Sequence, residues 1–197
     1  MIGKLHKFSY LILLLLIFLV FILIKLFSLS NEEKPSDYFP DSIMVKYFEG
    51  ELENDEFIQI IDKVEDDKIQ VKQINDNSKI VMVYDLTDTM IRLVYTYQGD
   101  EISDDYISNL EENRDDIIIK GPLKVGNSWD DNSGGVYEIT EMDIIVRTPA
   151  DGFEALLVEY NNDQLNIKEY YAKEIGLIKI VINNYIINEL VGIEFKD

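Results

Sequence analysis

The stretch TMIRLVYTY, residues 89–97, decides the fold class. Apolar and aromatic side chains occupy every second position from Ile91 to Tyr97, and Arg92 and Thr96 fall between them. A period of two places alternate side chains on opposite faces of a β-strand. The stretch therefore predicts a strand with one face, Ile91 to Tyr97, turned to the protein interior.

Ten further strand patterns surround this stretch, separated by polar turns rich in Asp and Asn. They are residues 44–50, 57–61, 69–74, 79–84, 117–120, 136–147, 153–160, 164–171, 177–182 and 185–195. The period slips near Glu141, which predicts a β-bulge, and the turns at 161–163 and 183–184 predict hairpins. We expect an all-β, antiparallel domain with a strongly curved sheet or half-barrel, possibly of two layers.

Residues 103–112 are the segment with the best helical pattern. Ser103 suits an N-cap, Asp104 and Asp105 suit a first helical turn, and the apolar face is narrow. A short helix and an irregular loop both remain open for this segment.

Charge is divided unevenly along the chain. Residues 1–30 carry Lys4, Lys7 and Lys25 and no acid, so residues 31–197 hold all 38 acids against 15 of the 18 bases, a net charge of −23. A domain this acidic is repelled by phosphate backbones. We expect no nucleic-acid partner.

Residues 8–27 form a hydrophobic run whose only charge, Lys25, lies one turn from its end. Twenty residues of helix cross a hydrocarbon core of about 30 Å, and Lys25 can extend its amine to the headgroups. With Lys4 and Lys7 before the run, the positive-inside rule predicts a transmembrane helix with a cytoplasmic N-terminus. The domain would then lie on the outer side of the cell membrane.

A cleaved signal peptide is the alternative, because Ser28 and Ser30 make a weak cleavage site. The domain would then be secreted. In either case we expect an anchor or signal at 1–30, a stem at 31–42 with two prolines, and a β domain at 43–197.

The chain lacks the residue types of several enzyme classes. It has no cysteine, and its only histidine is His6, beside the hydrophobic run. Thiol nucleophiles, a Ser-His-Asp triad and multi-histidine metal sites are therefore excluded from the domain. We expect no enzymatic activity and no cofactor. The alternative is a cell-wall hydrolase that uses paired carboxylates.

Four aromatic residues are candidates for ligand binding: Trp129, Tyr95, Tyr97 and Tyr171. Trp129, the only tryptophan, follows two predicted turns and fits either the rim of a binding cleft or a plug at the end of the sheet. Asp130, Asp131 and Asn132 are a weak calcium candidate. Their spacing lacks the EF-hand pattern, and a solvated turn is the simpler interpretation.

Several motifs together resemble a group of uncharacterised Gram-positive envelope proteins and lipoprotein-like proteins. The motifs are YFP at 38–40, GPLKVGNSW at 121–129, TPA at 148–150 with Phe153, and YYAKEIGLIK at 170–179. The resemblance implies an extracytoplasmic, curved β domain and brings no catalytic residues. Members of the group commonly continue from YFP into a Gly-x-x-Trp turn and often carry a lipobox cysteine, and both features are missing here.

These observations predict an extracytoplasmic binding or structural domain without catalysis. Its concave face would hold an apolar ligand or a peptide of an envelope protein partner. A subunit of an envelope sensory or assembly complex is a further alternative.

Overall fold

The computed structural model describes residues 16–20, 32–50, 56–65, 67–131 and 134–196. The chain divides into two units, residues 1–33 and 34–197. In the first unit residues 16–20 are helical, and the rest of the predicted span 8–27, with its flanking lysines, lies outside the described residues. Within the described part, no helix is both long enough and apolar enough to span a membrane.

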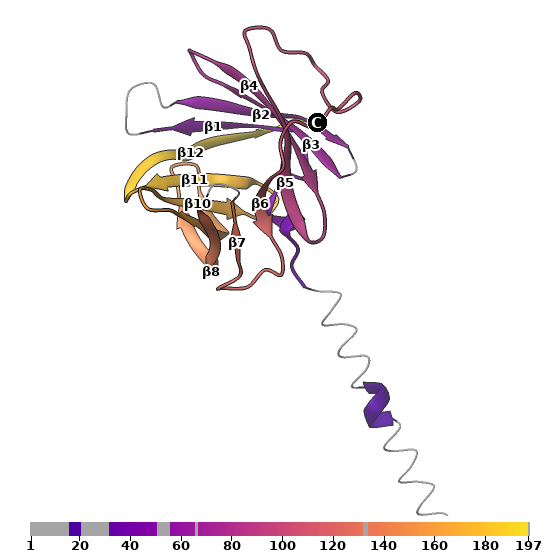
Figure 1. The fold of residues 1–197 in the computed structure, drawn as a ribbon. Coiled ribbons are helices and arrows are strands. Elements are labelled where there is room, and N and C mark those ends of the chain that lie inside the picture. Colours follow the sequence, from indigo (N-terminus) through magenta and orange to yellow (C-terminus); the bar gives the residue numbers. More distant parts are fainter. Residues whose placement is uncertain (1–15, 21–31, 51–55, 66, 132–133, 197) are drawn as a thin grey trace, which may run out of the picture. The chain divides into compact units, whose positions relative to one another are not determined.

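The second unit is built from twelve strands that form one antiparallel sheet (Figure 1). After the 3-10 helix η1 (Pro35–Tyr38), the strands are β1 (Met44–Glu49), β2 (Phe57–Glu65), β3 (Lys68–Ile74), β4 (Lys79–Leu86), β5 (Met90–Gln98), β6 (Asp116–Lys120), β7 (Ser128–Asp130), β8 (Val136–Arg147), β9 (Gly152–Asn161), β10 (Asn166–Ala172), β11 (Gly176–Ile182) and β12 (Tyr185–Phe195). Each of the eleven predicted stretches forms a strand. The strand β7 is additional.

The strand order is β6-β5-β4-β3-β2-β1-β12-β11-β10-β9-β8-β7. Neighbours in sequence pair antiparallel, except for β6 and β7, which form the two edges of the sheet. In addition, β1 pairs with β12 and so joins the first and last strands. The sheet curves strongly and is nearly closed, as Figure 1 shows. The expected all-β, antiparallel, strongly curved architecture is confirmed.

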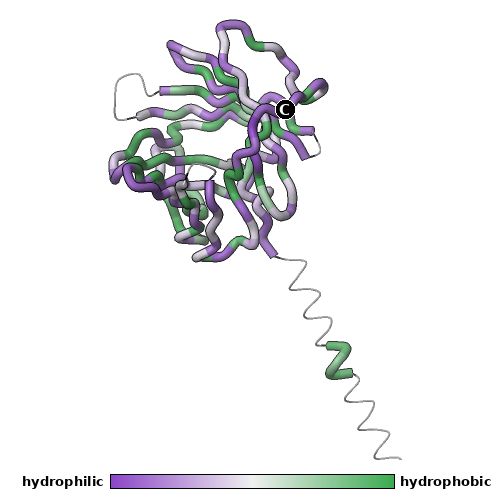
Figure 2. The backbone as a smooth tube through the Cα atoms, in the orientation of Figure 1, coloured by the Kyte–Doolittle hydropathy of each residue, from purple (hydrophilic) through white to green (hydrophobic). Residues whose placement is uncertain are grey.

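Alternation of side chains builds the interior of this curved sheet. Met44 pairs with Ile61, and Ile61 pairs with Val71, so all three point to the same inner face and are buried. Figure 2 shows hydrophobic and hydrophilic residues alternating along the strands. Exclusion of these side chains from water is the main force that holds the sheet in its curved form.

The two edge strands, β6 and β7, meet at a seam that side chains close. The indole Nε1 of Trp129 on β7 donates a hydrogen bond to the carbonyl of Ile117 on β6, at 3.1 Å. Asn127 Nδ2 donates to the carbonyl of Lys120 at 2.6 Å. Trp129 is buried, so its position corresponds to the plug that the sequence offered as one of two interpretations.

Residues predicted as stem contribute to the core of the second unit. Tyr38 is fully buried, and the Phe39 ring lies 4.7 Å from the ring of Tyr84. The Pro40 side chain reaches Gly176, where a Cβ would stand 2.9 Å from the proline Cδ. The folded unit therefore begins at Lys34 rather than at residue 43.

Residues 99–115 form an irregular excursion without helix, so the loop alternative for 103–112 is correct. The excursion is held to the outer face of the sheet by the buried side chain of Gln70. Its Nε2 donates to the carbonyl of Asp104 at 3.1 Å, and its Oε1 accepts from the backbone N–H of Tyr106 at 2.7 Å. Short polar residues favour local turns over helix here: the Asp105 carboxylate accepts hydrogen bonds from the Ser108 side chain and backbone.

A bulge in β5 changes which side chains face inward. Tyr84 pairs with Leu93, whereas its neighbour Val83 pairs with Tyr95. Because Val83 and Tyr84 point to opposite faces, Leu93 and Tyr95 do so as well. The prediction that one face runs unbroken to Tyr97 is therefore wrong beyond Leu93. The bulge predicted near Glu141 is confirmed by register shifts on both sides of that residue.

Candidate functional site

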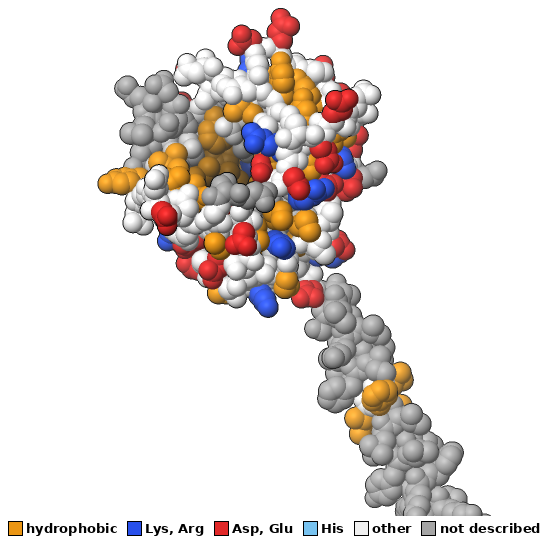
Figure 3. All heavy atoms as spheres, viewed as in Figure 1, with side chains coloured by type: hydrophobic (Ala, Val, Ile, Leu, Met, Phe, Trp, Pro, Cys, Tyr) orange, Lys and Arg blue, Asp and Glu red, His pale blue; other side chains and the backbone are white. Residues whose placement is uncertain are grey.

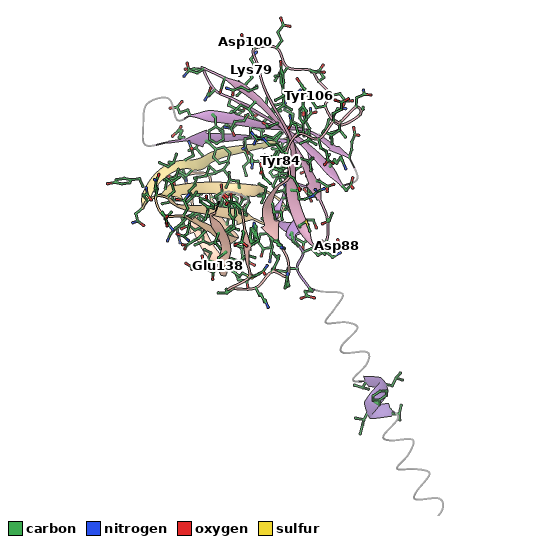
Figure 4. All side chains as sticks on the ribbon, viewed as in Figure 1. Lys79, Tyr84, Asp88, Asp100, Tyr106 and Glu138 are labelled. Atoms are coloured by element: carbon green, nitrogen blue, oxygen red, sulfur yellow. The ribbon has the colours of Figure 1, made fainter. Side chains whose placement is uncertain are left out.

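A cavity of about 180 Å³ lies inside the curved sheet, between the half formed by β1–β4 and the half formed by β10 and β11. Figure 3 shows a hollow lined with hydrophobic atoms on this face, and Figure 4 places Tyr84 toward the centre of the domain. The lining residues are Phe39, Pro40, Lys46, Gln59, Ile61, Val71, Gln73, Met82, Tyr84, Ile118, Glu169, Tyr171 and Leu177.

Strand register places a row of polar side chains on one wall of the cavity. Lys46 on β1 pairs with Gln59 on β2, and Gln59 pairs with Gln73 on β3. Gln59 Nε2 donates to Gln73 Oε1 at 3.2 Å. Three neighbouring strands therefore each turn one polar residue toward an interior that is otherwise mostly apolar.

Lys46 is an unusual member of this row because its side chain is 2% exposed. Its Nζ donates to the carbonyls of Ile175 and Leu177, both at 3.1 Å, and lies 5.4 Å from the centre of the Phe48 ring. Within the described part of the chain no carboxylate forms a salt bridge with it. Burial lowers the pKa of Lys46 to about 7, because an ammonium ion loses its hydration there.

Glu169 lines the cavity from another strand, β10. Its Oε2 accepts a hydrogen bond from the Tyr171 hydroxyl at 2.8 Å. Burial raises the pKa of Glu169, and the bond from Tyr171 only partly offsets this effect. Glu169 is half-buried and contributes to the lining of the cavity.

The phenol groups around the cavity stay protonated and act as hydrogen-bond donors. Burial raises the pKa of Tyr84, whose hydroxyl lies 3.2 Å from Met82 Sδ, and raises the pKa of Tyr171. An amine, a carboxyl group, two amides and two phenols thus surround a small space with apolar walls. Such a set can hold a small molecule by hydrogen bonds and charge.

The four aromatic candidates do not converge on one site. Tyr171 lines the cavity, whereas Trp129 closes the seam and stacks on Tyr137 with ring centres 5.6 Å apart. Tyr95 and Tyr97 point to the outer face, where each packs on Tyr106 of the excursion at 5.7 and 5.8 Å. Figure 4 shows Tyr106 at the periphery, away from Tyr84.

The sequence did not lead us to four polar residues of the cavity: Lys46, Gln59, Gln73 and Glu169. For Lys46, however, the sequence contains a signal. Lys46 alternates in phase with Met44 and Phe48, which are apolar and buried. A charged residue in phase with apolar ones on a predicted strand points to a buried charge. That pattern, rather than the aromatic residues, identifies this wall of the cavity.

Of the weak calcium candidate at Asp130, Asp131 and Asn132, the structure describes only the two aspartates. Asp131 Oδ1 accepts from the backbone N–H of Gly135 at 2.7 Å, and Oδ2 accepts from the Tyr160 hydroxyl at 2.8 Å. Asn132 lies outside the described residues. Among described residues, no group of three acids close enough to share a metal ion includes Asp130 or Asp131.

A second hollow, of about 570 Å³, lies near the ends of β1, β2 and β3. It is larger than the interior cavity, but its acidic residues Glu49, Glu56 and Asp76 are all exposed. Exposed carboxylates are well solvated and give little discrimination between ligands. The interior cavity is therefore the better candidate site.

Comparisons with known proteins bear on the fold. No family model and no curated protein matches the chain. Among solved structures, the chain is similar to an exported-protein candidate with a YmcC-like fold from Bacteroides fragilis. The identity is 14% and the TM-score 0.50, and the match covers 81% of this chain and 99% of that one. A lipoprotein candidate from Parabacteroides distasonis matches at 13% identity and a TM-score of 0.48, over 82% of this chain and 100% of that one. The Bacteroides fragilis protein shows that the chain shares its fold.

Proposed function

We propose that this chain is an extracytoplasmic binding protein, tethered to the membrane by residues 8–27, whose β domain takes a small molecule into the interior cavity. The observation that carries the proposal is the cavity itself, whose lining includes the buried amine of Lys46 and the half-buried carboxyl of Glu169. Polar groups buried next to an unfilled space are a feature of binding sites.

The volume of the cavity limits the size of the ligand. A volume of about 180 Å³ is close to that of an engineered cavity that holds benzene, roughly 150 Å³. A lipid chain is too large for it. The concave face has no free groove for a partner's peptide at η1, because the chain's own residues 35–40 pack there.

A non-catalytic role fits the composition of the cavity wall. Among the described residues that line it, Glu169 is the only carboxyl group, so the second acid of a paired-carboxylate hydrolase has no place there. Contact with a bound ligand is enough to give each polar group of the cavity wall a role, without a chemical step. Presentation outside the cell follows from Lys4 and Lys7 before the hydrophobic run. The export assigned to the Bacteroides fragilis protein of similar fold is in keeping with this location.

Topology is tested by labelling the full chain at single introduced cysteines, against a native background that contains none. The site Val125→Cys is exposed, and we expect a membrane-impermeant maleimide to label it in intact spheroplasts. Gly3→Cys serves as the matched control and should react only after lysis. Labelling of Val125→Cys only after lysis would refute the proposed location, and a shortened product in the medium would identify a cleaved signal peptide.

Binding is tested by a thermal-shift screen of small polar compounds on the full chain in non-ionic detergent. Ile118→Trp places a larger side chain at the cavity wall and serves as the blocked control, since Ile118 lines the cavity and is half-buried. We expect stabilising compounds to lose their effect on Ile118→Trp, with circular dichroism showing that the variant is folded. Equal shifts for both proteins, or no shift for any compound, would contradict the proposal.

A further inference from the structure

We infer that the cavity selects small carboxylates that carry a hydroxyl or amino group at their far end, with Lys46 binding the carboxylate and Glu169 the far group. The inference rests on the proposed function and names its ligand class. It follows from two polar groups that line one cavity from different strands, the buried amine of Lys46 on β1 and the half-buried carboxyl of Glu169 on β10, and from the apolar side chains of the same lining.

The first step concerns the amine of Lys46. An ammonium group has three donors, and two of them are used by the carbonyls of Ile175 and Leu177. Carbonyls are neutral acceptors, so in the described structure the positive charge is not compensated by an opposite charge. A ligand carboxylate in the cavity supplies both the third acceptor and the missing negative charge, in a setting where water screens poorly.

The second step concerns the wall formed by β10. Glu169 receives one hydrogen bond, from Tyr171, and contributes to the lining of the cavity. A carboxylate accepts hydrogen bonds, and a carboxylic acid can both accept and donate. A ligand hydroxyl or amine can therefore form a hydrogen bond with Glu169, whereas a second carboxylate on the ligand would lie beside another carboxyl group.

The third step concerns the body of the ligand. Ile61, Val71, Ile118 and Leu177 belong to the apolar part of the lining. These side chains favour a compact apolar body, and the volume of about 180 Å³ limits it to about one ring. The net charge of −23 on residues 31–197 repels anions at long range. Preference for a carboxylate must therefore come from the buried amine itself.

The test measures affinities of four one-ring probes for the full chain in non-ionic detergent: 4-hydroxybenzoate, benzoate, benzyl alcohol and benzylamine. We expect 4-hydroxybenzoate to bind most tightly and benzoate next, with benzyl alcohol and benzylamine weaker than both. Ile118→Trp in the same detergent corrects for probe that partitions into micelles.

Two variants test the contributions of Lys46 and Glu169 to binding separately. Lys46→Met should weaken both carboxylates about tenfold or more, the usual effect of losing a charge-assisted hydrogen bond, and leave benzyl alcohol unchanged. Glu169→Gln should reduce the advantage of 4-hydroxybenzoate over benzoate. Lys124→Met, at an exposed lysine, is the matched control and should change nothing. Circular dichroism and Trp129 fluorescence establish that each variant is folded.

The outcomes distinguish the two proposals. Binding that Ile118→Trp abolishes but Lys46→Met leaves unchanged would overturn the ligand class and keep the cavity as a binding site. Binding that neither variant affects lies outside the cavity and overturns both. Absence of binding by every carboxylate probe at millimolar concentration also overturns the ligand class, whatever the wider screen finds.

Discussion

Replacement of Lys46 by methionine should stabilise the domain near neutral pH, and the gain should disappear as the pH rises. The Lys46 amine is 2% exposed and its pKa falls from 10.5 to about 7 on burial. The unfolded chain keeps this proton up to about pH 10.5, whereas the folded chain releases it near pH 7. Unfolding therefore takes up a proton between these values, and rising pH favours the folded state.

The size of the effect follows from the same two values. Each pH unit between them changes the free energy of unfolding by about 1.4 kcal/mol, so the charged amine costs about 5 kcal/mol at pH 7 or below. Methionine removes this cost but also removes two hydrogen bonds to backbone carbonyls, each worth about 1 kcal/mol. We expect a net gain of about 2–3 kcal/mol at pH 7 from Lys46→Met.

The assay is urea unfolding of the full chain in non-ionic detergent, followed by the fluorescence of Trp129, the only tryptophan. The difference between Lys46→Met and wild type should shrink by about 3 kcal/mol between pH 7 and pH 9.5. Other titrating groups cancel in this difference, and exposed Lys124→Met controls for loss of a charge. A difference that stays constant with pH would show that Lys46 is solvated, and the account of the cavity wall would fail.

Three further substitutions test the structure around the cavity. Trp129→Phe keeps an aromatic ring, although a smaller one, and removes the hydrogen bond across the seam. It should lower the free energy of unfolding by about 1–2 kcal/mol in urea titrations read by circular dichroism. Gly176→Ala should lower the thermal midpoint by several degrees, because φ is +77° and a Cβ stands 2.9 Å from the Pro40 ring. Gln70→Leu removes two of the hydrogen bonds that hold residues 99–115 to the sheet. It should speed limited proteolysis within that segment, and an unchanged cleavage pattern would contradict the assigned role.

Local patterns were enough to predict most strands and hairpins of this domain. The alternation in residues 69–74 and 79–84 indicates directly that these residues form strands and which side chains share a face. The polar turns at 161–163 and 183–184 indicate tight connections. The three-residue strand β7 escaped notice because three residues are too few to show a period. Trp129 at its centre was visible, but its partner across the seam was not.

Non-local pairing and bulges could not be predicted in the same way. Nothing in the pattern of β1 or β12 specifies that they pair, because alternation gives the face of a strand and not its neighbour. One extra residue opposite Val83 turned Tyr95 and Tyr97 to the outer face, away from the cavity. Two of the four candidate residues were therefore assigned to the interior by a period that a single bulge interrupts.

The cavity is best understood from how a nearly closed sheet is filled. The inner face is packed at one side by Trp129 and its stacked neighbour Tyr137, and at another by Tyr38 and Phe39. Apolar side chains could fill the remaining space and would stabilise the domain, since a buried amine that no carboxylate neutralises costs free energy that methionine does not. A chain that keeps Lys46 there gives up stability at the position where a ligand could compensate its charge. The binding proposed for the cavity would account for this arrangement.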